Sequence, residues 1–110
     1  MAMNKAVKID ADKERNLKFN YNALIMLEEE FGIDVNDMER NMKLSDVRKL
    51  IYCGLLHEES DLTLEQVGDI IDEMLEKHGM EYVGQKIGEA FSKAFGTPKS
   101  TGTNPKNAKK

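Results

Sequence analysis

The sequence predicts a mainly α-helical protein, a compact bundle of four to five helices that follows a short N-terminal β-hairpin. Three observations support this fold class. Apolar residues recur at helical spacing in several segments between residues 22 and 95, which indicates amphipathic helices. Capping residues and glycines stand at the ends of these segments. Two segments within the first 21 residues instead alternate between apolar and polar side chains, as strands do.

The hairpin is predicted from two alternating segments. Period-two alternation appears in residues 5–10, where Val7 and Ile9 share one face, and again in residues 17–21. The polar residues 11–16 between them predict a hairpin loop. Because two strands alone are only marginally stable in water, we expect this hairpin to lie against the helices.

The first helix is predicted over about residues 22–31. Asn20 or Asn22 can cap its N-terminus. Gly32 favours a C-cap, because glycine adopts the left-handed backbone without a Cβ penalty. A short second helix is predicted over about residues 35–41, where polar residues have capping-box spacing.

A third helix is predicted from a cap at Ser45 to about His57. Residues 50–56 carry no charge on any side, which favours a central, buried helix. A seven-residue apolar run also fits a strand, but the cap, the glycine and the total length favour a helix. Gly54 within this run is predicted to permit close packing.

The last two helices have the clearest boundaries. Thr63 and Gln66 have capping-box spacing at the start of one helix, which ends at Gly79. The other helix is predicted over about residues 80–95 and stops at Gly96. Each of these helices carries a single apolar stripe, which predicts that one side faces the core.

Gly84 and Gly88 lie inside the last predicted helix, where each costs roughly 1 kcal/mol relative to alanine. Two interpretations are open. Either these glycines permit close helix contacts, or they weaken the fold so that it yields when a partner arrives. The sequence favours neither interpretation.

Residues 1–96 are predicted to form one domain, with the hairpin at about residues 5–21, and residues 97–110 a disordered basic tail. The tail holds both prolines, four lysines, no acidic residue and one apolar residue, Ala108, so it cannot offset the entropy of ordering. Without these four lysines, twelve basic residues face twenty acidic ones, a net charge of −8. Such a domain repels phosphates, which excludes nucleic acid as a partner and favours a basic polypeptide.

The sequence offers no arrangement that is typical of catalysis or of a cofactor. Cys53 stands in an apolar helix and is expected to be a small core residue. His57 and His78 lie near predicted helix C-termini, where the helix dipole favours an imidazolium. Residues 61–72 have the length of a calcium loop but lack its glycine and its final glutamate. We therefore predict no catalytic, cofactor-binding or metal-binding residue, and a protein that is not an enzyme.

The composition predicts a soluble, intracellular protein. No run approaches the roughly 18 apolar residues that a membrane span needs. The first residues lack the pattern of a secretory signal, and a single cysteine fits a reducing cytosol. We therefore expect no membrane among its partners.

Four segments together resemble a known family. They are a strand, an Asn-Ala-Leu helix that ends in Glu-Glu-Phe-Gly, an apolar segment with Cys-Gly-Leu, and a capping segment Leu-Thr-Leu-Glu-Gln-Val-Gly, at residues 17–21, 22–32, 50–58 and 62–68. In this order and spacing, over about residues 5–95, the chain resembles the tail assembly chaperones of long-tailed bacteriophages and related prophages. Cys53 is a mild departure, since the family commonly has alanine there.

The resemblance implies a non-enzymatic protein that works in the cytoplasm of the bacterial host. Chaperones of this family bind the tape-measure protein, keep its apolar helices soluble and help to recruit tail-tube subunits during tail morphogenesis. Some of them self-associate, so the resemblance also allows a weak homo-oligomer. The sequence leaves one alternative open, a small acidic regulatory adaptor that inhibits a host or phage enzyme.

A chaperone of this kind needs apolar surface that its partners can reach, and methionine adapts to varied contacts. Six apolar residues on the predicted helices are therefore candidate partner-binding residues: Ile25, Met26, Tyr52, Leu56, Met74 and Met80. The alternative is that all six are ordinary core residues.

Overall fold

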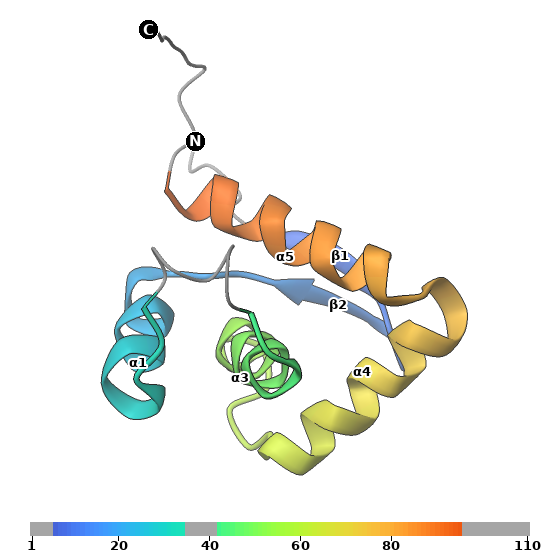
Figure 1. Ribbon diagram of the computed structural model, residues 1–110, viewed down its shortest axis with the longest axis horizontal. Helices are drawn as coiled ribbons and strands as arrows, with labels where there is room; N and C mark the ends of the chain where they lie inside the picture. Colours follow the sequence, from blue (N-terminus) through green and yellow to red (C-terminus); the bar gives the residue numbers. More distant parts are fainter. Residues whose placement is uncertain (1–5, 35–41, 96–110) are drawn as a thin grey trace, which may run out of the picture.

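The computed structural model describes residues 6–34 and 42–95, which contain one antiparallel β-hairpin and four helices (Figure 1). The mainly α fold class with a short N-terminal hairpin is therefore confirmed. The predicted helix at residues 35–41 and the predicted tail at residues 97–110 lie outside the described residues. The elements are β1 Val7–Asp10, β2 Glu14–Leu17, α1 Tyr21–Phe31, α3 Leu44–Leu55, α4 Leu64–His78 and α5 Met80–Ala94.

Helix α3 is the central element of the molecule. It packs against α1 on one side, α4 on the other, and β2 above, while α5 runs alongside the hairpin and pairs with α4 (Figure 1). Six of its residues are buried: Val47, Leu50, Ile51, Cys53, Gly54 and Leu55. The prediction of a central, buried helix is therefore confirmed, and so is the packing of the hairpin against helices.

The second strand of the hairpin differs from the prediction. It begins at Glu14 and ends at Leu17, so the second half of the polar stretch predicted as a loop is strand. The chain beyond Leu17 runs across to α3. The register pairs Val7 with Leu17 and Ile9 with Arg15. Arg15 therefore occupies an inward position, and it tolerates burial because carboxylates pair with its guanidinium.

Helix α1 has the predicted caps at both ends. The side chain of Asn20 accepts a hydrogen bond from the backbone N–H of Ala23 at 2.8 Å, which satisfies a donor of the first turn. Gly32 ends the helix in the left-handed conformation, with φ of 64°. Only Ala23 and Leu27 of this helix are buried, and its main contacts are with α3.

The predicted start and end of α3 are wrong. Ser45 is not its N-cap; the helix begins at Leu44, and the carboxylate of Asp46 accepts a hydrogen bond from the backbone N–H of Lys43 at 3.1 Å. A carboxylate in the first turn also interacts favourably with the helix dipole, so Asp46 takes the role that the sequence assigned to Ser45. The helix ends at Leu55, short of His57.

The boundaries of α4 and α5 are confirmed within one residue. Thr63 and Gln66 exchange both hydrogen bonds of the capping box, at 3.1 Å and 3.0 Å. Gly79, with φ of 88°, joins the two helices, which pack against each other as a helical hairpin.

The glycines have two different environments. A Cβ atom on Gly54 would collide with Leu17 Cδ1 and approach Phe19 Cε1 to 3.3 Å, so this glycine permits close packing of α3 under the hairpin, as predicted. A Cβ atom on Gly84 or Gly88 would meet nothing within 4 Å. Close contact within the described molecule therefore does not explain Gly84 and Gly88.

Candidate protein-binding surface

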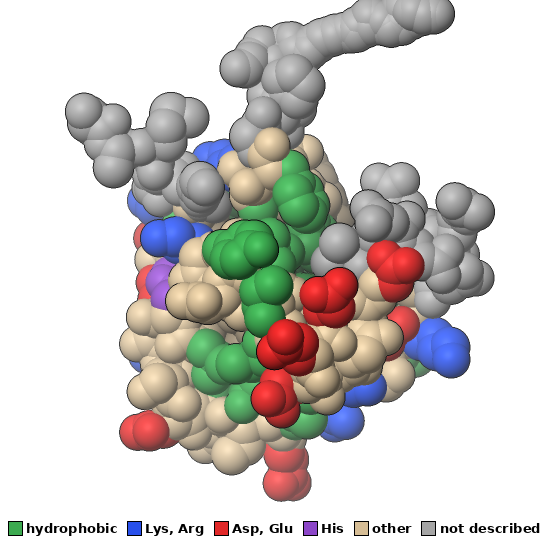
Figure 2. All heavy atoms as spheres, turned by 90° about the vertical axis from the view of Figure 1, so that its left-hand side faces the viewer, with side chains coloured by type: hydrophobic (Ala, Val, Ile, Leu, Met, Phe, Trp, Pro, Cys, Tyr) green, Lys and Arg blue, Asp and Glu red, His purple; other side chains and the backbone are tan. Residues whose placement is uncertain are grey.

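Large hydrophobic side chains are exposed where the N-terminal end of α1 lies near the C-terminal end of α5. Tyr21 is 76% exposed and Phe95 is 59% exposed. Figure 2 shows a continuous band of hydrophobic side chains on this side of the molecule. Exposed aromatic rings that gather in a band are typical of binding surfaces, because soluble monomers rarely expose large apolar patches.

A stack of three aromatic rings connects this band to the core. Phe19, which is 1% exposed, stacks on Phe91 with ring centroids 4.3 Å apart and an interplanar angle of 5°. Phe91 in turn stacks on Phe95 with centroids 6.0 Å apart. Because the inner rings are packed, they hold the outer ring in one orientation, and a partner that contacts Phe95 has little side-chain entropy left to lose.

Helix α1 carries further apolar side chains on the side that faces away from α3. Ala23 and Leu27 face α3, and Tyr21 and Ile25 lie on the opposite side of the helix, one turn apart. Leu24 lies between these two sides and is half-buried. We name Tyr21, Leu24, Ile25, Phe91 and Phe95 the α1/α5 face.

Acidic side chains follow along α1, and two of them, Glu28 and Glu29, lie on the side of the helix that carries Tyr21 and Ile25. Glu28, Glu29 and Glu30 are exposed in the last turns of α1, which hold no basic residue. No salt bridge joins any of the three to a basic group within residues 6–34 and 42–95. Figure 2 shows acidic side chains along one side of the hydrophobic band. Carboxylates at a helix C-terminus oppose the helix dipole, so these three do not serve the stability of α1.

The structure places the six predicted partner-binding residues in three different environments. Ile25 and Met26 are half-buried on α1, and Ile25 belongs to the α1/α5 face. Tyr52 and Leu56 are half-buried against the core, and the ring of Tyr52 meets the edge of Phe31 with centroids 6.0 Å apart.

The other two predicted residues lie away from the α1/α5 face. Met74 is fully buried, which corrects its prediction as partner-accessible surface: the apolar stripe of α4 faces α3 and α5, so its sulfur has no access to a partner. Met80 is 43% exposed but begins α5, so it lies at the opposite end of that helix from Phe95.

Tyr21 and Phe95 are the two binding-surface residues that the sequence did not identify. Tyr21 continued the alternation of the hairpin, which assigned it to the inner face of a strand. Phe95 lies one helical turn after Phe91, and that i, i+4 aromatic pair at a helix end was the available signal.

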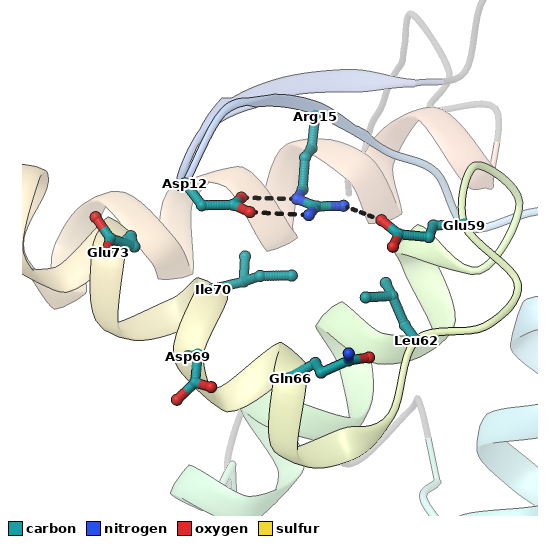
Figure 3. A pocket seen from close by; sticks show the side chains of 8 residues that line it. All are labelled: Asp12, Arg15, Glu59, Leu62, Gln66, Asp69, Ile70 and Glu73. Carbon is teal, nitrogen blue, oxygen red and sulfur yellow. Dashed lines mark hydrogen bonds and ion pairs between the residues drawn. The ribbon is translucent and has the colours of Figure 1, made fainter.

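A pocket of about 270 Å³ lies on another side of the molecule, between the hairpin loop and α4. Figure 3 shows the Arg15 guanidinium between the carboxylates of Asp12 and Glu59, above Leu62 and Ile70. Arg15 contacts both oxygens of Asp12, at 2.8 Å and 2.9 Å, and one oxygen of Glu59 at 2.9 Å. Three further side chains from α4 line the pocket, namely Gln66, Asp69 and Glu73.

The electrostatics of this pocket indicate a structural role. The hydrogen bond from Arg15 lowers the pKa of Asp12, and the same pairing raises the pKa of Arg15. A carboxylate that is held ionised by a bidentate guanidinium is poorly suited to accept protons near neutral pH. The network instead ties the hairpin loop to the segment between α3 and α4, in which Glu59 lies.

A second polar cluster fixes β1 where it meets the hairpin loop. His78 lies 3.0 Å from the Asp10 carboxylate, a contact that lowers the pKa of Asp10, and its ring stacks on Tyr82. The Tyr82 hydroxyl accepts a hydrogen bond from the Asp10 backbone N–H at 2.9 Å. These contacts join β1 to the turn between α4 and α5.

The described residues contain no group of three or more histidine, cysteine or acidic side chains that could share a metal ion. Burial raises the pKa of the Cys53 thiol to about 12, which keeps it protonated and unreactive at neutral pH. None of the helices in the described ranges is long and apolar enough for a bilayer crossing. The α1/α5 face is therefore the feature of this structure whose chemistry most favours a function.

No protein-family model matches this chain, and no curated protein or solved structure is significantly similar to it.

Proposed function

We propose that this protein is a non-enzymatic tail assembly chaperone of a long-tailed bacteriophage or prophage. It binds the tape-measure protein in the cytoplasm of the bacterial host, keeps it soluble and helps to recruit tail-tube subunits. The sequence resemblance supplies the family, and the surface of the molecule supplies a means of binding.

One observation carries the proposal: an aromatic band that is exposed in the free chain and fixed from below by the core. Tyr21 and Phe95 expose most of their surface to water. Exposed rings of this kind gain free energy when a partner covers them, at about 25 cal/mol per Å² of apolar surface. Such a surface suits the capture of apolar helices before they assemble.

The charge of the domain supports the same function. A net charge of −8 over residues 1–96 keeps copies of the protein apart and favours partners with basic segments. For the same reason we expect self-association to be weak. Coiled helices of a partner offer apolar stripes, and lysine-rich flanks on them would complement this acidic domain.

Co-expression of the full chain with the tape-measure protein of the same genome tests this function. We expect the tape-measure protein to move from the insoluble to the soluble fraction and to co-purify with the chain. A version of the chain with a scrambled order serves as the control. If the tape-measure protein stays equally insoluble with and without the chain, the chaperone function is wrong and the regulatory adaptor becomes the better hypothesis.

A further inference from the structure

The α1/α5 face combines three properties that together specify a partner. It is apolar, because Tyr21 and Phe95 are exposed and Ile25 is half-buried on the side of α1 that faces away from α3. It is preorganised, because Phe95 rests on Phe91 and Phe19. Its border is acidic, because Glu28 and Glu29 both lie about two turns along α1 from Tyr21.

We propose that this face is the docking site for one amphipathic helix whose apolar stripe is flanked by lysine or arginine. This inference rests on the proposed function and assigns it to a place on the molecule. The apolar stripe of the partner covers Tyr21, Ile25 and Phe95. Its basic flank lies along the acidic border of α1.

The size of the face fits a short helix. Helix α1 has 11 residues and is about 16 Å long, which corresponds to about three turns of a partner helix. Anchors spaced at i, i+3, i+4 and i+7 on such a helix present an apolar stripe of this length. The exposed ends of the two helices, at Tyr21 and Phe95, are the expected anchor points for it.

Charge and composition argue against two other occupants of this face, a second copy of the chain and the chain's own C-terminal residues. In a symmetric dimer the same patch lies on both copies, so the glutamates of α1 would meet each other and repel. The C-terminal residues 97–110 are basic, but apart from two prolines their sequence offers one apolar residue, Ala108, and so lacks the apolar stripe that an aromatic surface favours. A separate helix with both apolar and basic character satisfies the surface completely.

Glu28 and Glu29 give independent support to this assignment. They face no basic partner in the described residues, and they oppose the dipole of the helix that carries them. These carboxylates lower the stability of their own helix and border an exposed apolar surface. A basic ligand that neutralises them would explain both features.

Peptide binding to the full-length chain tests the site directly. The probe is a fluorescently labelled helical peptide of about 20 residues, with leucine on one face and lysine on its flanks. A matched peptide carries glutamate in place of each lysine. Binding is measured by fluorescence anisotropy at low and at high salt. We expect the lysine peptide to bind, the glutamate peptide to bind at least about tenfold more weakly, and the difference to shrink in high salt.

Two matched pairs of variants locate the site. We expect the double variant Tyr21→Ser with Phe95→Ser to weaken binding by about tenfold or more, because aromatic anchors dominate such interfaces. Met80→Ser removes an exposed apolar side chain at the other end of α5, about 20 Å away, and should leave binding within about twofold. Circular dichroism confirms that each variant keeps its helices.

The second pair tests the acidic border. We expect Glu28→Lys with Glu29→Lys to weaken binding of the lysine peptide about tenfold and to strengthen binding of the glutamate peptide. Asp72→Lys with Glu76→Lys makes the same charge change on the exposed side of α4 and should have a smaller effect. The inference is overturned if each double variant at the α1/α5 face weakens peptide binding no more than its control does. It is also overturned if the two peptides bind equally, or if neither peptide binds.

This outcome is separate from that of the proposed function. If the variant with Tyr21→Ser and Phe95→Ser solubilises the tape-measure protein as well as the original chain does, the proposed function stands and the docking site is wrong. If the chain binds the lysine peptide at this face but does not solubilise the tape-measure protein, the docking site stands and the proposed function is wrong.

Discussion

Arg15 occupies an inward-facing strand position that alternation normally gives to an apolar residue. Its side chain is 7% exposed, whereas its partners Asp12 and Glu59 are 39% and 45% exposed. The guanidinium is thus buried and the carboxylates keep much of their hydration. At the residue scale, this network fixes the hairpin loop to the rest of the molecule.

Replacement of Arg15 tests the strength of this network. We expect Arg15→Ala to lower the free energy of unfolding by about 1–3 kcal/mol, because two partly solvated carboxylates lose their partner and the packing under the hairpin is lost. Urea denaturation followed by circular dichroism measures the change. Lys8→Ala removes the exposed Lys8–Glu14 pair and should cost less than about 1 kcal/mol. Equal effects of the two substitutions would contradict this account.

The pKa of Asp12 predicts a pH dependence of stability. The pKa is lowered in the folded state from its usual value of 3.8, chiefly by the hydrogen bond from Arg15. The unfolded chain therefore binds a proton first as the pH falls, and the stability contributed by Asp12 is full above pH 3.8 and is lost below it. We expect Asp12→Asn to make unfolding less steeply dependent on pH in this acid range. An unchanged slope would show that Asp12 is not held by Arg15.

At the scale of elements, α3 and α1 differ most in how they are held. Helix α3 contacts α1, α4 and β2 and buries six residues, whereas α1 buries two and has its main contacts with α3 alone. Burial of apolar surface supplies most of the stability of short helices. We therefore expect helix α1 to open most readily, and it is also the helix that carries the acidic border of the binding face.

The acidic end of α1 gives a prediction that joins stability to binding. We expect Glu29→Lys to raise the free energy of unfolding by about 0.3–1 kcal/mol, because a cation replaces an anion at the helix C-terminus. The same substitution should weaken binding of a basic helix. Thermal unfolding of the free chain measures the first effect. A variant that is less stable than the original chain would contradict the assignment of Glu29 to binding rather than to folding.

The two kinds of glycine predict opposite effects of alanine. We expect Gly54→Ala to lower the free energy of unfolding by about 1–3 kcal/mol, because the added methyl group collides with Leu17. Gly84→Ala should raise it by up to about 1 kcal/mol, because a helical glycine in open space is replaced by a better helix former. Urea denaturation of both variants measures the difference, and effects of the same sign would contradict the packing described for α3.

For the whole molecule, the sequence predicted what depends on local pattern. Asn20, Thr63 and Gly79 set helix ends through their own backbone and side-chain hydrogen bonds, and these boundaries were confirmed. Arg15 was missed because its burial depends on Asp12 and on Glu59, which lies 44 residues away. The exposure of Tyr21 likewise depends on how α1 packs on α3, which no local pattern specifies.

The partner surface was predicted only in part for the same physical reason. Periodicity shows which residues share a face of a helix, but not whether a neighbouring element covers that face. Met74 belongs to the apolar stripe of α4, which faces α3 and α5 and is buried. Ile25 lies on a helix whose outer side has no neighbour among the described elements. In comparable sequences, aromatic residues at helix ends, such as Phe95, are the sequence feature that best indicates an exposed binding residue.

Hydrogen exchange of the full chain, alone and in its complex with the tape-measure protein, tests the central claim most directly. Backbone amides report slow exchange wherever binding stabilises a helix. We expect the largest gain in protection in α1, with a second gain at the C-terminal turn of α5 around Phe91, and little change at the start of α5 around Met80. A complex that protects α4 and the start of α5 and leaves α1 unchanged would contradict the account.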